Sequence, residues 1–169
     1  FGLRQLGANC GLIAQHACTE INGRSYWMSD NAFYMYDGVV KKMPCSVQDF
    51  VFDDLSYTNK ADIACGINSA FNEIIWYYPS ADATQIDRAV VYNYLENTWY
   101  TTSLSRTTWL GAYVFELPIA TEYDASLSAN NSTILGLTAG ASYIYEHETG
   151  NNQADGTAIT AFLTSGSVE

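Results

Sequence analysis

Basic residues are scarce in this sequence. Lys and Arg together number 7 against 18 acidic residues, which gives a formal net charge of −11 over 169 residues. This balance disfavours tight binding to a nucleic-acid backbone, because that affinity comes from Lys and Arg displacing counterions. The acidic residues are scattered along the chain. A net negative charge is expected of a protein that a polyanion must slide past without binding. It is equally expected of a protein whose charge serves only its solubility.

Long apolar runs and leader segments are also missing. No apolar stretch reaches the roughly 18 residues needed to cross a bilayer, and no charged-then-apolar segment opens the chain. We therefore expect no membrane span. The chain begins at Phe1 without Met and stops at Glu169 shortly after a strand-like run, so we expect it to be part of a longer polypeptide.

The few cysteines and histidines lack the spacing of metal sites. Cys10, Cys18, Cys45 and Cys65 form no CxxC pair, and His16 with Cys18 does not make the paired spacing of a zinc site. Four cysteines permit three disulfide pairings in an oxidising compartment, but free, largely buried thiols are the favoured interpretation for a chain of this length. We predict no metal and no cofactor.

Hydrolase motifs are absent as well. There is no GxSxG and no glycine-rich phosphate loop. His16 and His147 fall in strand-like segments, where packed or surface imidazoles are commoner than general bases. The available carboxylates do not show a pair flanking one bond, as a glycosidase requires. They are Asp53, Asp54, Asp82, Asp87, Glu146 and Glu148. We predict that the chain is not an enzyme and assign no catalytic residue.

Two further binding functions deserve weighing. Asp30-Asn31 and residues 151–156 are oxygen-rich turns that could hold calcium, but neither has EF-hand spacing, and a hairpin turn at 155–156 is the simpler interpretation of the second. The four tryptophans could form a sugar platform. Trp76 and Trp99, however, lie in strongly apolar segments, which favours packing between sheets.

Aromatic residues are abundant and indicate an all-β fold. The chain has 13 Tyr, 7 Phe and 4 Trp, which suit a pleated, half-buried surface. Short β-rich runs are separated by Gly, Asn, Asp and Ser. Asn22-Gly23 and Asp37-Gly38 predict tight hairpin turns in a four-stranded antiparallel meander with strands at 16–21, 24–28, 32–36 and 39–43.

Two more meanders follow a short helical connection. Val47, Phe50, Val51 and Leu55 predict a helix or helical turn within 45–59, with Ser46 as its N-cap. The strands of the second meander are predicted at 61–64, 72–78, 88–94 and 98–103. Those of the third are predicted at 109–117, 118–121, 142–147 and 157–163.

An aromatic-rich strand before a polar turn recurs in each meander, around Tyr36, Tyr92 and Tyr145. A period of about 50 residues with four strands per unit is typical of β-propeller blades with long connections. We therefore predict antiparallel meanders forming propeller-like blades at 11–43, 61–103 and 109–163, within one structural unit covering 1–169.

Several segments resemble podovirus-like bacteriophage tail proteins of the tail nozzle, tail tubular or head-to-tail stabilisation type. The resemblance is carried by residues 63–80 (IACGINSAFNEIIWYYPS) and 87–99 (DRAVVYNYLENTW), with flanks at 26–38 (YWMSDNAFYMYDG) and 145–150 (YEHETG). It covers most of the chain. The sequence departs from the pattern at 126–141, where a longer small-residue insert replaces a tight turn.

The resemblance implies a structural role in the virion tail. The subunit would be assembled in the host cytoplasm, surround the tail channel as a ring of several copies and contact adaptor or portal-associated proteins. It would retain the genome and let it leave without binding it specifically. We expect some of Asp53, Asp54, Asp82 and Asp87 to line the channel. The alternatives are a carbohydrate-binding or adhesive β-propeller and, less favoured, a propeller glycosidase.

Overall fold

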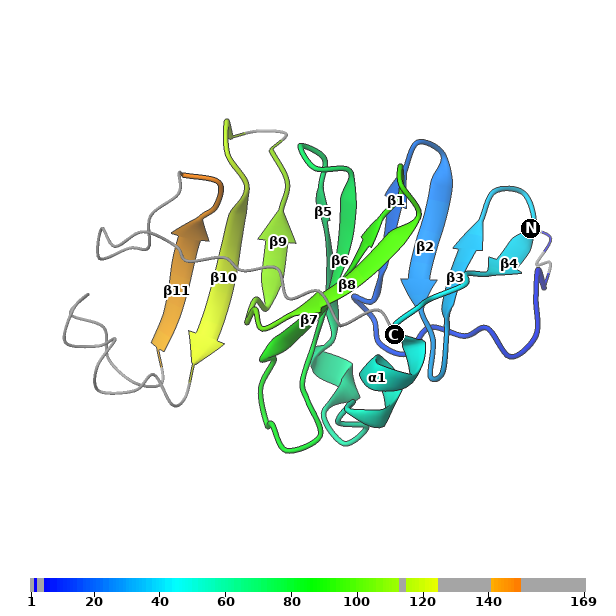
Figure 1. Cartoon of the computed structure of the whole chain (residues 1–169), viewed down its shortest axis with the longest axis horizontal. Coiled ribbons are helices and arrows are strands. Elements are labelled where there is room, and N and C mark those ends of the chain that lie inside the picture. Colours follow the sequence, from blue (N-terminus) through cyan, green and yellow to red (C-terminus); the bar gives the residue numbers. More distant parts are fainter. Residues whose placement is uncertain (1, 3–4, 113–114, 125–140, 150–169) are drawn as a thin grey trace, which may run out of the picture.

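The computed structural model describes residues 2, 5–112, 115–124 and 141–149. These residues form three antiparallel sheets, one short α-helix and one turn of 3-10 helix, which confirms the predicted all-β class with a short helical connection. The three sheets follow one another along the long axis of the molecule (Figure 1). Within the described ranges they do not close into a barrel or ring.

The first two sheets are four-stranded meanders and the third has three strands in the described residues. The first contains β1 (Cys18–Ile21), β2 (Arg24–Met28), β3 (Phe33–Tyr36) and β4 (Val40–Lys42). The middle sheet contains β5 (Ala64–Asn68), β6 (Glu73–Tyr78), β7 (Arg88–Asn93) and β8 (Thr98–Thr102). The third contains β9 (Thr108–Leu110), β10 (Ile119–Asp124) and β11 (Ala141–Glu146).

The hairpin turns depend on residues that tolerate a left-handed backbone. Asn22 and Gly23 have φ of 53° and 72°, and Gly38 has φ of 107°, as the predicted turns require. Asn72 and Asn97 adopt φ of 60° and 57° in the turns after β5 and β7. Asparagine enters this region more readily than other non-glycine residues, so these positions set the registers of the paired strands.

The helical connection is shorter than the predicted range. Helix α1 spans Gln48–Asp53, and a 3-10 turn, η1, spans Lys60–Asp62. The prediction of Ser46 as N-cap is wrong, because the helix begins later and Val47 occupies the cap position without a side-chain cap. Val51 is buried as predicted, whereas Phe50 is exposed and lies beneath the guanidinium of Arg88.

Two strand predictions are corrected. The first strand of the middle sheet was expected at 61–64, but it lies at Ala64–Asn68 because η1 occupies most of the expected range. The strand expected at 109–117 ends at Leu110. The predicted strand at 157–163 lies outside the described residues, as does nearly all of the insert at 126–141.

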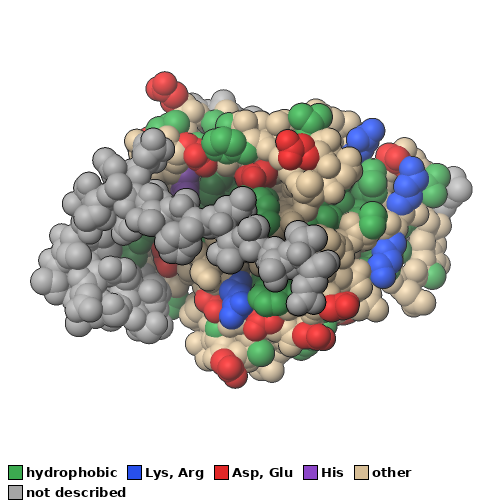
Figure 2. All heavy atoms as spheres, viewed as in Figure 1, with side chains coloured by type: hydrophobic (Ala, Val, Ile, Leu, Met, Phe, Trp, Pro, Cys, Tyr) green, Lys and Arg blue, Asp and Glu red, His purple; other side chains and the backbone are tan. Residues whose placement is uncertain are grey.

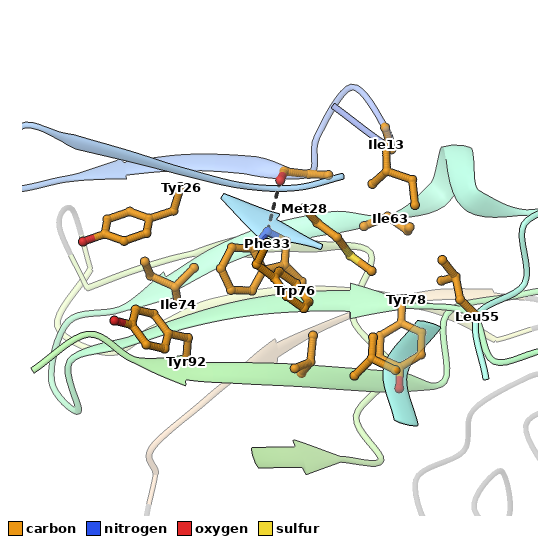
Figure 3. Packing of buried hydrophobic residues seen from close by; sticks show 14 of the residues in the cluster. Ile13, Tyr26, Met28, Phe33, Leu55, Ile63, Ile74, Trp76, Tyr78 and Tyr92 are labelled. Atoms are coloured by element: carbon orange, nitrogen blue, oxygen red, sulfur yellow. Dashed lines mark hydrogen bonds between the residues drawn. The ribbon is translucent and has the colours of Figure 1, made fainter. Parts of the chain in front are cut away.

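The middle sheet buries both of its faces, which explains its almost uninterrupted apolar strands. Ile74, Trp76 and Tyr78 of β6 point toward the first sheet, where Phe33 and Met28 meet them (Figure 3). The alternate residues of β6 and β7 face the third sheet and pack with its Trp109. These residues are Ile75, Tyr77, Ala89 and Val91. The stacking order is therefore first, middle, third.

The four cysteines form no disulfide. All four cysteines lie in the described part of the chain and are free. Cys18 is exposed and the other three are partly buried, so the expectation of largely buried thiols is wrong for Cys18.

Among the described residues, no helix combines the length and apolarity that a membrane crossing needs.

Candidate functional site

The polar groups with the most unusual environments lie between the middle and third sheets. We call Arg106, Trp109, Glu122, Tyr145 and His147 the inter-sheet junction. Arg106 precedes β9, Trp109 lies in β9, Glu122 in β10 and Tyr145 in β11, while His147 directly follows β11. The three strands of the third sheet thus each present a side chain to one guanidinium or to its partners.

Arg106 organises this junction. Its Nη1 donates to Glu122 Oε2 at 2.8 Å, and its Nε donates to Nε2 of His147 at 2.9 Å. The guanidinium also lies 4.4 Å from the ring centroid of Tyr145. The side chains of Arg106 and Glu122 are only 12% and 14% exposed. A shielded ion pair with satisfied donors holds its geometry more firmly than an exposed one.

His147 is neutral at physiological pH. Burial, and secondarily the adjacent Arg106 guanidinium, lower the pKa of His147 to about 4. Its ring packs on Trp109 with centroids 4.7 Å apart. Because Nε2 accepts a hydrogen bond from Arg106, its lone pair is occupied and cannot take a proton from a substrate. The contacts therefore favour the packed role expected for His147 over that of a general base.

The middle sheet contributes a buried phenol to the same layer. Tyr77 packs against Trp109, with ring centroids 6.2 Å apart. Its hydroxyl has no hydrogen-bond partner among the described residues, and burial raises the pKa of Tyr77 far above its ordinary value. A phenol in this environment stays protonated, so it is no nucleophile at neutral pH.

A second polar group lies on the same face of the middle sheet. We call Asn68, Glu73, Tyr100 and Glu148 the carboxylate cluster. Tyr100 Oη donates to Glu73 Oε1 at 2.8 Å, and Asn68 Nδ2 donates to Glu148 Oε1 at 3.1 Å. Burial raises the pKa of Glu73, the Tyr100 hydrogen bond lowers it and the Glu148 charge raises it again, with a net upward shift.

The tryptophans link elements instead of forming an open platform. Each indole N–H donates to a main-chain carbonyl: Trp27 to Cys10, Trp76 to Ala17, Trp99 to Pro44 and Trp109 to Ile67. The last three bonds cross between neighbouring sheets or the segments that flank them. The packing role predicted for Trp76 and Trp99 is confirmed, since both lie in the core between the first and middle sheets.

The four aspartates expected near a channel gather at one end of the middle sheet, close to α1. Asp54 Oδ2 lies 3.1 Å from Arg88 Nε, and Asp87 accepts hydrogen bonds from the main chain and hydroxyl of Ser80. Asp53 and Asp82 are exposed. Acidic side chains are numerous around this end of the molecule (Figure 2).

The surface hollows beside α1 and around His16 do not gather a catalytic set of side chains. One, of about 500 Å³, lies beside α1 and is lined mainly by residues 42–46. Another, of about 310 Å³, brings His16 near Asp62 and Thr107. Asp30 is paired with Lys60, and residues 151–156 lie outside the described ranges. No group of three or more His, Cys, Asp or Glu side chains suited to a metal occurs in the part of the chain that the structure describes.

Sequence reasoning missed most of both polar groups. Arg106 is one of only 7 basic residues, and it stands alone in a Ser/Thr-rich connection between two strands. That isolation is a signal of a buried ion pair, but its partner could not be chosen among 18 acids. Nothing in the sequence marked the other group: Asn68 fell between two predicted strands, while Glu73 and Tyr100 lay within predicted strands without any motif.

Comparison with known proteins does not identify relatives. No protein-family model matches the chain, and no curated protein matches it either.

Proposed function

We propose that this chain is a structural module of a bacteriophage tail nozzle, in which its sheets are consecutive blades of a β-propeller beside the genome channel. The observation that carries the proposal is the face-to-face stack of three successive antiparallel sheets. In a propeller, each blade covers the faces of its neighbours in this way. The sequence resemblance to tail nozzle proteins supplies the biological setting.

The first strands of successive sheets lie next to one another, as they do around a propeller axis. The main chain at His16, just before β1, forms a parallel bridge with Ala64 of β5. Gly66 of β5 lies against Trp109 of β9, so closely that a Cβ at Gly66 would be 2.5 Å from Trp109 Cβ. Glycine at this position lets β5 and β9 approach.

The outer face of the third sheet fits a further blade. Leu110, Tyr123 and Ile144 are 43%, 38% and 75% exposed. The pairing of β10 with β9 and β11 places them on one face, together with Ile119. Exposed apolar side chains gathered on a sheet face are typical of a surface that another element covers.

The negative net charge is suitable for a channel through which DNA passes. A net charge of −11 repels a passing polyanion and prevents its adsorption. Under this proposal the chain binds other copies of itself in a ring and contacts adaptor or portal-associated tail proteins. Its location is the virion tail, its assembly takes place in the host cytoplasm, and its role is to retain and release the genome without catalysis.

Electron microscopy of the particle that carries the full-length protein tests the proposal. The expected result is a ring of copies around an axial channel, with these three sheets as adjacent blades. A solitary propeller that binds a glycan array through its central pocket would contradict the tail role and favour the carbohydrate-binding alternative. Saturable glycoside turnover, lost on one carboxylate substitution, would favour the glycosidase.

A further inference from the structure

Strand β4 forms one edge of the first sheet, because β3 is its only ladder partner among the described residues. The N–H of Met43 donates to the carbonyl of Phe33 at 2.8 Å, and bonded and non-bonded pairs alternate along an antiparallel ladder. The main-chain groups of Val40 and Lys42 therefore point away from β3. In the part of the chain that the structure describes, they have no main-chain partner.

A hollow of about 200 Å³ opens beside this edge, between the first and middle sheets. Its lining is mainly apolar, with Met35 from β3, Tyr92 from β7, and Met43 and Pro44 from the segment after β4. The hollow of about 500 Å³ beside α1 shares Lys42, Met43 and Pro44 with it. The two hollows therefore adjoin each other at the end of β4.

The same corner of the molecule is basic, although the chain as a whole has a net charge of −11. Lys41 and Lys42 are the only two basic residues adjacent in the sequence. The hydrogen bond from Lys41 lowers the pKa of Asp37, and the charge of Arg24 lowers it further, so both cations lie near this carboxylate. Lys42 has no ion-pair partner among the described residues.

These charges leave an excess of positive charge at the β4 edge. Asp49 is the acidic side chain that lines the larger hollow. Arg24, Lys41 and Lys42 thus outnumber the two nearby carboxylates of Asp37 and Asp49. Lys and Arg side chains gather over this end of the molecule (Figure 2). The charge of this edge is complementary to that of an acidic partner.

We propose that the β4 edge binds an extended acidic segment of another protein, which adds to the first sheet as an antiparallel strand. In this mode of recognition, main-chain hydrogen bonds supply affinity and hollows for alternate side chains supply specificity. Lysines on an exposed edge disfavour pairing with neutral or basic strands, so Lys42 also restricts the choice of partner. The proposal does not depend on a role in a phage tail.

The two faces of the added strand need different side chains. Lys41 is opposite Met35, whose side chain packs on the core, so this face of β4 leads to the apolar hollow. Val40 and Lys42 have their side chains on the outer face, where Gly7 lies against Val40 and Lys42 is exposed. The bound strand should therefore carry acidic residues on its outer face and apolar residues on the face toward the hollow.

Binding is measured on the 169-residue chain by fluorescence anisotropy of the fluorescein-labelled peptide Ser-Glu-Leu-Glu-Leu-Glu-Ser. We expect saturable binding that weakens at least about fivefold when the NaCl concentration rises from about 0.05 to about 0.5 M. Replacement of both Leu by Ser should weaken binding by about tenfold or more, because the apolar burial is lost. Replacement of the three Glu by Lys should abolish binding.

Methylation of peptide nitrogens tests the added strand itself. Residues directly opposite Val40 and Lys42 share their face, so the Glu residues of the bound strand should exchange main-chain hydrogen bonds with β4. N-methylation of the Glu nitrogens should therefore abolish binding. N-methylation of the Leu nitrogens, which point away from β4, should change the affinity by less than about twofold, because no bond to β4 is lost.

A matched pair of variants tests the charge. Lys42→Glu and Lys60→Glu change the net charge of the chain equally, but Lys60 lies in η1 and pairs with Asp30. Lys42→Glu should weaken binding by about tenfold or more, since it replaces an attraction with a repulsion. Lys60→Glu should change the affinity by less than about twofold, because its charge lies away from the β4 edge.

Four outcomes would overturn the proposal. These are no binding of the acidic peptide, equal binding of the Lys peptide, equal effects of methylation at Glu and at Leu, or equal effects of Lys42→Glu and Lys60→Glu. Circular dichroism shows whether each variant is folded. If Lys42→Glu does not fold, the two methylated peptides, measured on the unaltered chain, still decide the question.

Discussion

Both faces of the middle sheet are covered by a neighbouring sheet, but the side chains that make the contacts differ in kind. Toward the first sheet, Trp76 stacks on Trp99 with ring centroids 6.0 Å apart, and Phe33 lies 5.0 Å from Trp76. Toward the third sheet, an Arg106–Glu122 ion pair and a neutral histidine accompany a smaller apolar cluster. The first interface depends on buried apolar area, while the second also depends on charge state.

This contrast predicts different sensitivities. Apolar burial hardly changes with pH or salt near neutrality, because no group in it titrates. An interface that contains Arg106 and His147 responds to protonation and to ions. The third sheet should therefore detach first under acid, and the first sheet should be the more robust partner of the middle one.

The largest expected effect comes from breaking the apolar interface. Trp76→Ala removes a fully buried ring and its hydrogen bond to the Ala17 carbonyl. We expect a loss of about 3–5 kcal/mol in the free energy of unfolding, measured by urea denaturation. Phe71→Ala, at an exposed aromatic in the turn after β5, serves as the control with a change of under about 0.5 kcal/mol. Equal losses in both would contradict this account of the core.

Removing the central cation of the junction should have the next largest effect. Arg106→Met leaves Glu122 as a shielded carboxylate without its partner, and we expect a loss of about 2–3 kcal/mol. The double variant Arg106→Met with Glu122→Gln should recover part of that loss, because the uncompensated charge is gone. A double-mutant cycle by urea denaturation measures the coupling. A coupling near zero would show that the ion pair does not support the interface.

Acid should weaken the second interface through His147. The unfolded histidine binds a proton near pH 6.5, but the folded one does so only near pH 4. The contribution of the neutral His147 to the free energy of unfolding is therefore fully present above pH 6.5. It is lost as the pH drops from 6.5 to 4, and the loss is about 1–2 kcal/mol for this partly screened group. His147→Gln keeps an acceptor for Arg106 and should flatten this part of the pH profile relative to the parent. If the slope of the free energy of unfolding against pH stayed unchanged in this variant, the loss of stability in acid would come from carboxylates elsewhere in the protein.

The smallest effect is expected at the unpartnered phenols. Tyr77→Phe removes a buried hydroxyl that lacks a partner among the described residues, so stability should stay equal or rise by up to about 1 kcal/mol. Tyr78→Phe makes the matching change on the other face, where the hydroxyl also has no such partner. A loss above about 1 kcal/mol in either variant would mean that its hydroxyl has a partner in solution, such as a buried water.

Local patterns determined much of the fold. Asn22-Gly23 and Asp37-Gly38 set tight turns because Asn22, Gly23 and Gly38 adopt a left-handed backbone. The aromatic strands around Tyr36 and Tyr92 could be located because such residues need a pleated surface to pack on. The connection at 45–59 was harder to predict, since a six-residue helix is too short for its periodicity to mark the ends.

The sequence by itself determined the all-β class, the order of the meanders and most hairpins, because these depend on neighbouring residues. Only the tertiary structure decided that Arg106 meets Glu122 and His147, and that Asn68 meets Glu148. These partners are separated by many residues and come together through the stacking of whole sheets. Pairing across sheets depends on long-range packing, and 18 acidic residues offer too many equivalent choices for a linear pattern to select one.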